Sequence, residues 1–430
     1  MNRALASVVT SSFVAPFSLS TLSVSLPLVA RDLGVSAVDT MLSLVAFTLA
    51  VAVSVLPLGR SADVLGPVVV FRTGLLVAVA GLASASLSPG FDLLCVTLAV
   101  GGVGLAAVFG SNNALLFQVA TPDRRASAID LSSMSVYLGL FTGPFLGGFL
   151  AQVSWRAVFL PALVLLSASV FLARGLPAQR TQVGEDFDWV GAVLSALSLA
   201  LVVWGVSAAS PLFTGVGLAA LTLTVLYESG QRSPVVDVRL FRSFVFSALL
   251  LAAFLNYFST AALTPTLSLL FQEEYNMTPR DAGMLLALQA LAMAIFVPVA
   301  GRLSDKTSPS VVSAGGAALL AASLFAYAHA AVSSPSPHLL FLMGVGFALF
   351  IVPNTTLILS SVPPARRGTA SALAAEARVV GQSLSNAAAV NVLKNYPSLP
   401  SGVTALLLLL SAVALATALL SIARYVAMRL

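Results

Sequence analysis

Apolar stretches of about 20 residues, the length that a helix needs to cross a bilayer, follow one another along the whole chain. Polar residues are concentrated in the short breaks between these stretches. Hydrophobic residues make up 58% of the 430 positions and charged residues only 9%, so a water-soluble fold could not bury so much apolar surface. The sequence therefore predicts an all-α, multi-pass membrane protein.

Charged residues, prolines and glycines at the breaks divide the chain into fourteen predicted transmembrane helices. Their approximate bounds are 5–30, 38–59, 67–88, 92–119, 126–152, 155–174, 189–208, 211–228, 243–272, 281–301, 309–331, 338–361, 367–392 and 401–425. The first stretch, from about Leu5 to Val29, is too long for the core of a cleaved signal peptide and counts as a span. Because the connections are short, no soluble domain is predicted between the spans.

Lys and Arg residues favour one side of the membrane. With the N-terminus inside, sixteen of the 21 fall on the cytoplasmic side, and only Arg31, Arg156, Arg280 and Lys394 fall on the other. Positive residues concentrate in the cytoplasmic loops of membrane proteins. Both termini are therefore predicted to be cytoplasmic, in a cell (inner or cytoplasmic) membrane, and the charge of +5 reflects topology rather than nucleic-acid binding.

The sequence repeats itself at a separation of 242 residues. The matching segments are Gly59 to Asp63 with Gly301 to Asp305, Ser36 to Asp39 with Thr278 to Asp281, Asn112 with Asn354, Pro122 to Arg125 with Pro364 to Arg367, and Gly139 with Gly381. The two segments that end in Asp39 and Asp281 each have the pattern of a capping box that opens a helix. Because the matches involve Gly, Pro, Asn and paired Arg rather than common aliphatic residues, they indicate a duplication.

This separation leaves room for two additional spans between two six-span halves. An even number of inserted spans preserves orientation, so the halves are predicted to be parallel and related by a pseudo-twofold axis along the membrane normal. The predicted domains are an N-terminal six-helix bundle (1–178), a linker with two extra helices (179–242) and a C-terminal six-helix bundle (243–430). In such an arrangement the substrate path lies between the halves near the middle of the bilayer.

The segment from Gly59 to Asp63 resembles the loop motif that transporters of the major facilitator superfamily carry between spans 2 and 3, and Gly301 to Lys306 resembles its second copy. In that family the aspartate of the motif lies near the N-terminus of a helix in the opposite half, where the helix dipole stabilises a carboxylate. The resemblance implies a cytoplasmic latch formed by Gly59, Arg60, Asp63, Arg302 and Asp305. The alternative is an ordinary basic turn that maintains the topology.

Five residues of span 5 match the antiporter motif of exporters in the same superfamily: Gly139, Gly143, Pro144, Gly147 and Gly148. Small residues four apart let helix backbones approach closely, and a proline removes one backbone hydrogen bond so that the helix can bend. A general small-residue packing surface is the alternative interpretation of this motif.

Trp155-Arg156 resembles the start of span 6 in drug exporters. Two other short segments, Phe187-Asp188-Trp189 and Leu240-Phe241-Arg242, resemble the fourteen-span drug:proton antiporter family. The chain is similar to that family over nearly its whole length, and the resemblance implies proton-coupled export. Two positions depart from it. Ser18 stands where span 1 usually carries an aspartate, and Leu98 where span 4 usually carries an arginine. Either proton coupling involves other residues, or transport does not use protons in the usual way.

Charged side chains inside a span are expensive and are by default functional candidates. Glu376 and Arg378 lie well inside span 13, about 200° apart around the helix, so one is expected to face the cavity and the other a neighbouring helix. Glu376 is the predicted site of protonation, Arg378 aligns with an arginine common in the family, and a structural ion pair is the alternative. Asp130, about one turn into span 5, is a third candidate for proton or cation coupling, although water can satisfy it there.

Uncharged polar residues on the inner spans are candidates for the wall of a substrate cavity. They are Ser18, Thr21, Asn112, Asn113, Tyr137, Asn256, Tyr257, Thr260, Gln289, Asn354 and Gln382. Asn112 and Asn354 are repeat-related and are predicted to hydrogen-bond across a closed cytoplasmic gate. Many Ser and Thr hydroxyls in helices bond their own backbone instead. A cavity with so little charge suits an amphipathic or neutral organic solute better than a polyanion.

The favoured function is proton-coupled export of amphipathic or lipophilic small organic molecules by alternating access. The alternative is a facilitator or importer of a neutral metabolite without proton coupling. No nucleophile–base pair or phosphate-binding glycine loop is apparent in the sequence, so an enzyme is not expected. His329 and His338 have no cysteine nearby, so neither a metal nor a cofactor is expected. The expected partners are the substrate, protons and the lipid bilayer, and the expected state is a monomer.

Overall fold

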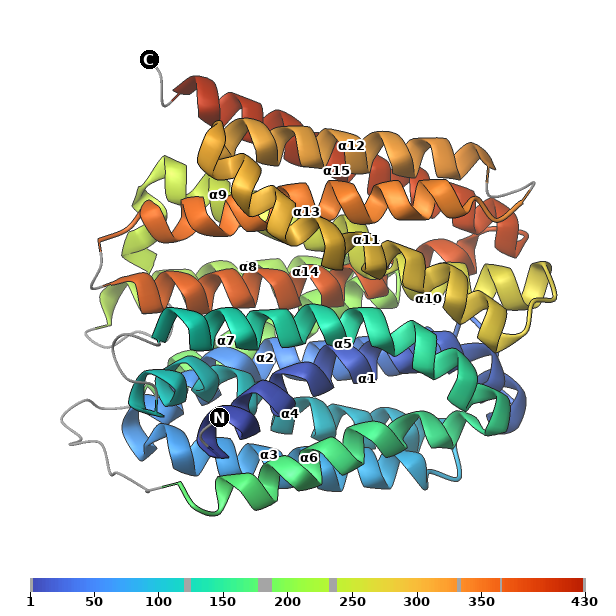
Figure 1. Cartoon of the computed structure of the whole chain (residues 1–430), viewed down its shortest axis with the longest axis horizontal. Coiled ribbons are helices and arrows are strands. Elements are labelled where there is room, and N and C mark those ends of the chain that lie inside the picture. The colour runs from blue at the N-terminus through green and yellow to red at the C-terminus, as the bar shows by residue number, and fades with distance from the viewer. Residues whose placement is uncertain are drawn as a thin grey trace.

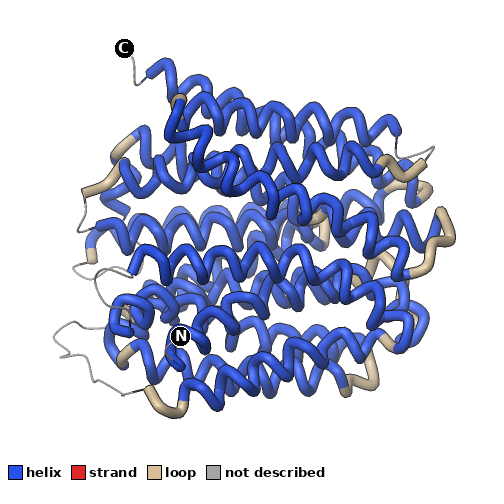
Figure 2. Tube along the Cα trace, in the orientation of Figure 1, coloured by secondary structure: helices blue, strands red, loops and turns tan. Residues whose placement is uncertain are grey.

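The computed structural model describes residues 3–119, 125–176, 188–231, 238–330, 334–363 and 366–427, and these residues form helices joined by short loops (Figure 2). The side chains of two candidate residues, Asn113 and Asp130, lie outside the described part of the chain.

The first half contains α1 (Arg3–Leu33), α2 (Met41–Leu65), α3 (Pro67–Ser86), α4 (Phe91–Val119), α5 (Arg125–Val153), the short η2 (Trp155–Phe159) and α6 (Leu160–Ala173). The inserted pair is α7 (Trp189–Ser207) and α8 (Pro211–Gly230). The second half contains η3 (Val238–Arg242), α9 (Phe244–Ala261), α10 (Leu263–Leu269), the π-helical η4 (Leu270–Glu274), α11 (Pro279–Lys306), α12 (Pro309–Ala330), α13 (Pro337–Ser360), α14 (Arg367–Asn395) and α15 (Leu399–Ala427).

Within the described residues these elements make fourteen long helical passages, because α9, α10 and η4 follow one another as one interrupted passage. Thirteen of the passages are long and apolar enough to cross a membrane by length and composition. The fourteenth, α14, does not reach that criterion, and it carries Glu376 and Arg378 in its interior. The predicted all-α membrane fold is confirmed, and its most polar passage is the one with the two intramembrane charges.

Several helix starts follow directly from the sequence. The Thr278 hydroxyl accepts a hydrogen bond from the Asp281 amide, and Pro279 occupies the first turn of α11, where its missing N–H is not needed. Asp188 caps α7 in the same way by accepting from the Gly191 amide. The matching segment before α2 behaves differently. Ser36 accepts from the Asp39 amide, but this turn precedes a helix that begins only at Met41.

Repeat-related glycines make equivalent contacts in the two halves. Gly102 of α4 lies against Phe47 and Ala50 of α2, and Gly344 of α13 lies against Gln289 and Ala292 of α11. Each of these residues is 242 positions from its counterpart. A Cβ atom on either glycine would come within 2.7 Å or less of a backbone carbonyl oxygen, so the helices could not approach so closely with a larger residue. The duplication seen in the sequence is therefore also a duplication of packing.

The two halves lie next to each other, with α3 and α6 at one edge of the bundle and α12 and α15 at the other (Figure 1). Contacts between the halves come mainly from α5 with α11, α14 with α2, and α1 with α10. In Figure 1, α5 and α11 converge toward the right and separate toward the left. Both marked chain ends lie toward the left. Functional contacts between the halves are therefore expected along these three pairs.

Candidate functional site between the two halves

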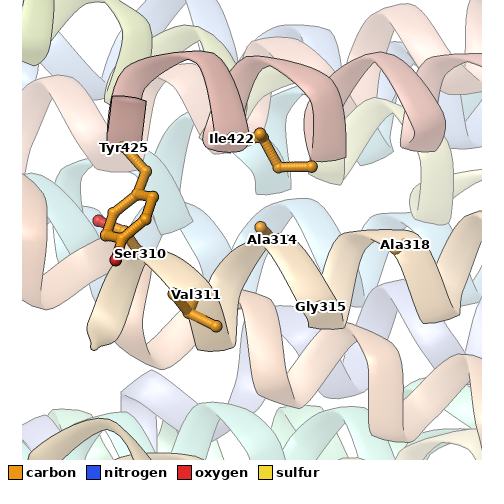
Figure 3. Close-up of a pocket in the computed structure, with 7 residues that line it drawn as sticks. All are labelled: Ser310, Val311, Ala314, Gly315, Ala318, Ile422 and Tyr425. Atoms are coloured by element: carbon orange, nitrogen blue, oxygen red, sulfur yellow. The ribbon is translucent and has the colours of Figure 1, made fainter. Parts of the chain in front are cut away.

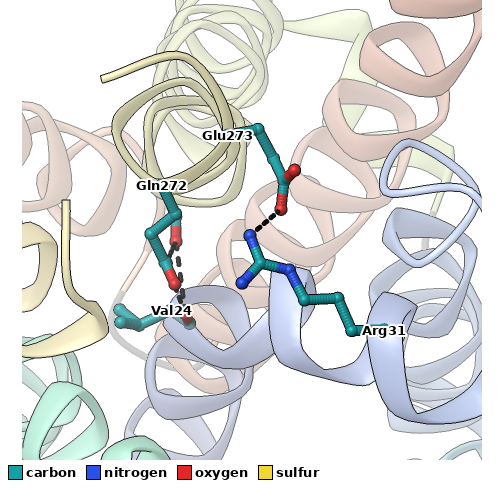
Figure 4. A network of polar contacts seen from close by, with 5 residues as sticks. Val24, Arg31, Gln272 and Glu273 are labelled. Atoms are coloured by element: carbon teal, nitrogen blue, oxygen red, sulfur yellow. Dashed lines mark hydrogen bonds and ion pairs between the residues drawn. The ribbon is translucent and has the colours of Figure 1, made fainter. Parts of the chain in front are cut away.

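One end of the interface is held together by polar contacts between the halves (Figure 4). Arg31 of α1 forms an ion pair with Glu273 of η4, with 3.1 Å between Nη2 and Oε1. Beside it, Gln272 donates a 2.8 Å hydrogen bond to the carbonyl oxygen of Val24. Arg31 and Glu273 are separated by the same 242 residues as the repeat, which places this pair close to the pseudo-twofold axis.

Further contacts close the same end. Lys394 of α14 forms an ion pair with Asp39, which precedes α2. The guanidinium of Arg280 lies over the ring of Phe149, with 4.7 Å to the ring centroid. The Ser268 hydroxyl also donates to the carbonyl oxygen of Val24 at 3.3 Å. All of these residues belong to the side predicted from the Lys and Arg distribution to be the outer one.

Glycines bring the backbones of α5 and α11 together at this end. A Cβ atom on Gly148 would lie 2.6 Å from the carbonyl oxygen of Pro279, and one on Gly283 would lie 2.4 Å from that of Pro144. Gly139, Gly143 and Gly147 instead pack against α1, which belongs to the same half. The span 5 motif thus makes two kinds of contact. Three of its glycines pack α5 against α1, and Pro144 and Gly148 pack α5 against α11 of the second half.

The predicted latch residues lie at the opposite end. Gly59 packs against Gly110 of α4, and a 3.4 Å ion pair joins Arg60 to Asp63 within α2. Arg302 and Asp305 are exposed at the end of α11, and no ion pair between either of them and another described residue is found. The ion pair found at the latch thus lies within one helix, whereas the described polar contacts that join the halves gather at the other end.

Aromatic side chains surround Arg378 in the middle of α14. Its guanidinium lies over the ring of Phe109 of α4, with 5.9 Å to the ring centroid. The positive charge of Arg378 also acts on the hydroxyl groups of Tyr137 of α5 and Tyr257 of α9. The ring of Tyr257 meets that of Phe347 of α13 edge to face, with 5.5 Å between centroids. These five residues, the Arg378 cluster, come from both halves.

Glu376 lies on a different face of α14 from Arg378. Positions 376 and 394 are about five helical turns apart, so Glu376 shares a face with Lys394, which pairs with Asp39 next to α2. Because Lys394 pairs with Asp39 and α14 packs along α2, we infer that Glu376 lies on the side of α14 that faces the first half. The Oε2 atom of Glu376 is buried and has no hydrogen-bond partner among the described residues. The two intramembrane charges do not form an ion pair with each other.

The two repeat-related asparagines bond within their own halves. The Asn112 amide donates 2.9 Å to the Ser12 hydroxyl of α1. The Asn354 amide donates 3.2 Å to the carbonyl oxygen of Leu249 of α9, and its Oδ1 accepts from the buried Arg424 of α15 at 3.5 Å. The predicted hydrogen bond between Asn112 and Asn354 concerns a closed cytoplasmic gate. In the conformation seen here, which is closed at the opposite end, each side chain joins helices of its own half.

The remaining cavity candidates differ in their surroundings. Thr21 and Thr260 donate to carbonyl oxygens of their own helices. Ser18 and Asn256 are buried with side-chain oxygens or nitrogens that have no partner among the described residues. Gln289 is also buried. Gln382 lies one turn beyond Arg378 on the same face of α14 and extends the polar strip at the cluster.

A cavity of about 300 Å³ lies elsewhere, between α12 and α15 (Figure 3). Its walls are formed by small and apolar residues together with Ser310 and Tyr425. None of its lining residues belongs to the Arg378 cluster, and several of them are exposed on the outside of the bundle, where lipid is expected. We therefore assign the functional site to the interface and not to this cavity.

Sequence reasoning missed several participants in the interface, among them the ion pairs at the predicted outer end. Phe109 and Phe347 look like ordinary apolar residues of a span, and nothing in the spacing distinguishes them from lipid-facing phenylalanines. Gly283 lies about one turn after the Thr278 cap, and its contact with the backbone of Pro144 and Gly148 left no signal in the sequence.

The chain is similar to known membrane transporters along nearly its whole length. The profile of the Major Facilitator Superfamily matches residues 8–385 and, in a second alignment, residues 249–427. The uncharacterized transporter YebQ of Escherichia coli (strain K12) is 27% identical over 387 residues, covering 86% of this chain and 84% of that protein. The multidrug resistance protein B homolog of Mycobacterium tuberculosis (strain CDC 1551 / Oshkosh) is 26% identical over 410 residues, covering 90% and 75%. The riboflavin transporter RibZ of Clostridioides difficile (strain 630) is 24% identical over 384 residues, covering 87% and 84%.

Solved structures share the fold. A peptide transporter POT in complex with sulfate has a TM-score of 0.74 at 17% identity, covering 98% of this chain and 94% of that one. The human organic anion transporter MFSD10 has a TM-score of 0.64 at 17% identity, covering 97% of each. At such identities the likeness concerns the fold alone. The shared fold agrees with the profile match over both halves, with the duplicated packing and with the site between the halves. This chain is therefore a membrane transporter of the Major Facilitator Superfamily.

Proposed function

We propose that the protein exports amphipathic small organic molecules in exchange for protons, by alternating access to the interface between its halves. Multidrug transporters among its relatives support export, although they share only about a quarter of its residues. The contacts at the predicted outer end correspond to a conformation that faces the cytoplasm. In this conformation the Arg378 cluster is the place where a solute from inside would bind.

The observation that carries proton coupling is the environment of Glu376. A charged carboxylate buried without a partner is strongly unfavourable, whereas the protonated acid is much less so. Its Oε2 has no hydrogen-bond partner among the described residues, so we assign the neutral form to this conformation. Glu376 faces α2 of the opposite half, and relative movement of the halves would change its access to water. A side chain in this position can therefore take up a proton on one side and release it on the other.

Proteoliposomes containing the purified protein test the proposal. An acidic compartment on the outer side is expected to drive accumulation of an amphipathic dye there, measured with one anionic and one cationic dye. Glu376→Gln is expected to lose at least about tenfold of this gradient-driven accumulation while keeping dye exchange without a gradient, because only the proton site is removed. Glu274→Gln, an exposed glutamate at the outer end, serves as the matched control. Unchanged accumulation by the Glu376→Gln variant would remove Glu376 from the mechanism.

A facilitator without proton coupling is the second candidate, and one observation favours it. Ser18 of α1 stands where relatives of the drug:proton antiporter family usually carry an acid, and its buried hydroxyl has no partner among the described residues. In this case an imposed pH gradient would not alter dye accumulation in the wild-type protein. The same proteoliposome experiment therefore separates the two candidates before any variant is made.

A further inference from the structure

We propose that the interface site selects organic anions with a flat apolar part, and that Arg378 binds their anionic group. This inference rests on the proposed transport function only in taking the interface as the substrate path. It concerns the chemical class of the substrate, and not the driving force or the direction of transport.

The first support is the missing counter-charge. The described acid–base pairs are Arg31 with Glu273, Arg60 with Asp63, Arg156 with Asp32, and Lys394 with Asp39, and none involves Arg378. Glu376 lies about 200° away around α14. A guanidinium in the middle of the membrane without an anion is unfavourable by several kcal/mol, and this energy is recovered when a ligand supplies the anion.

Acidic residues on the helices that surround Arg378 could also supply its counter-charge. The described parts of α4, α9 and α13 hold one, Asp92, which is seventeen positions from Phe109 at the far end of α4. On α11, Asp281 and Asp305 lie at its two ends. None of these described acids is next to the guanidinium, so among the described residues none supplies its counter-charge, and a ligand can do so.

The second support is the chemistry around the guanidinium. Phe109 lies beneath it, and the hydroxyl groups of Tyr137 and Tyr257 are near its positive charge. Both tyrosines pack against a buried apolar cluster that contains Met293 and Phe347. Hydroxyl donors next to a guanidinium suit a carboxylate or sulfonate, and ring faces with a methionine suit the flat apolar body attached to it.

The same arrangement disfavours cations. A substrate ammonium group in this cluster would be repelled by Arg378, and no described acid within the cluster offsets that repulsion. Neutral analogues lack the charge-assisted hydrogen bond and leave the guanidinium unpaired. The expected order of affinity is therefore anion, then neutral analogue, then cation, for three molecules of equal size.

A binding experiment with detergent-purified full-length protein tests this order. The probes are naphthalene-2-sulfonate, naphthalene-2-sulfonamide and 2-naphthylmethylammonium, which share one ring system and keep their charge states over a wide pH range. Affinities are measured by calorimetry at several salt concentrations. The sulfonate is expected to bind at least about tenfold more tightly than the sulfonamide, as the loss of one charge-assisted hydrogen bond implies.

Arg378→Gln is expected to bring the sulfonate and sulfonamide affinities within about twofold of each other, while Arg378→Lys keeps part of the preference because it retains the charge. Arg174→Gln, at an exposed arginine that directly follows α6, is the matched control and should leave the preference unchanged. A sulfonate that binds no better than the sulfonamide, or not at all at millimolar concentration, overturns the proposal, and so does a preference that survives in the Arg378→Gln variant. No proton gradient is present in this assay, so a failure of proton coupling would leave its result unaffected.

Discussion

At the scale of single residues, Arg424 is the most unusual group in the second half. Its side chain is 1% exposed, and among the described residues its only hydrogen bond is the 3.5 Å contact with Oδ1 of Asn354. The Nε and Nη2 atoms are buried without partners there. Replacing buried charged groups by apolar residues of similar size is often neutral or stabilising, whereas truncating them is not. Arg424 is therefore a test of how this half tolerates a buried charge.

We expect Arg424→Ala to lower the stability of the protein by about 1–3 kcal/mol, because it leaves a cavity and an unpaired Asn354 oxygen. Arg424→Met fills most of the volume without the charge and should match or exceed the wild-type melting temperature. Thermal unfolding in detergent, followed by circular dichroism, compares the three proteins. If the Met variant were as unstable as the Ala variant, the charge of Arg424 itself would be required for the stability of the protein.

The sequence predicted individual residues of the Arg378 cluster but not the cluster itself. The sequence identified Arg378, Tyr137 and Tyr257 as candidates, since charged and polar groups inside spans are rare. It could not bring them together, because their proximity depends on the packing of three helices far apart in the chain. Asn112 and Asn354 were expected from the repeat to pair across a closed cytoplasmic gate, and in this conformation, closed at the other end, each has a partner within its own half.

At the scale of elements, the meeting of α5 and α11 controls how closely the halves can approach at the predicted outer end. The atoms that a Cβ on Gly148 or Gly283 would meet belong to the backbone, which cannot move aside as a side chain can. These glycines therefore act on the conformational equilibrium of the transporter, and a larger residue disfavours the conformation seen here.

Gly283→Leu is expected to destabilise this closed outer end by about 1–3 kcal/mol, the usual penalty for overpacking, and so to shift the population toward outward-open molecules. Distances between spin labels on the outer ends of α5 and α11 would report the shift. Gly315→Leu is the matched control, because a Cβ at Gly315 meets nothing within 4 Å. An unchanged distance distribution in the Gly283→Leu variant would mean that the contact does not limit closure.

Helix bounds were predicted well, because apolar runs between charged breaks leave few alternatives. The interruption between α9 and α10 was missed, although Pro265 lay inside the predicted span 243–272. Proline lacks the N–H that continues a helix. The Ala262 amide at the break donates its hydrogen bond to the Ser385 hydroxyl of α14 at 3.1 Å, a tertiary contact that no local pattern reveals.

At the scale of the whole molecule, the ion pair between Arg31 and Glu273 joins the two halves close to the axis that relates them. Both side chains are partly exposed, with 64% and 32% of their surface accessible, so each such pair contributes only about 0–1 kcal/mol. A modest contribution suits a gate that has to open in every transport cycle.

We expect Arg31→Glu to raise the outward-open population by up to about fivefold, since it replaces an attraction by a repulsion. Adding Glu273→Arg in the same protein should restore the wild-type population, because the exchanged pair has the same geometry. The spin-label measurement described above follows both changes. If the double variant behaved like the single one, the pair would not contribute to closure.

The inserted hairpin makes the two sides of the transporter unequal. Helix α7 contacts both α2 and α14, and the Asn391 amide of α14 donates 3.0 Å to the Val206 carbonyl oxygen of α7. The seam between α2 and α14 is thus in contact with α7, whereas α7 and α8 do not pack along the seam between α5 and α11. For a solute already dissolved in the surrounding lipid the two seams are therefore not equivalent, because the two extra helices were inserted on one side only.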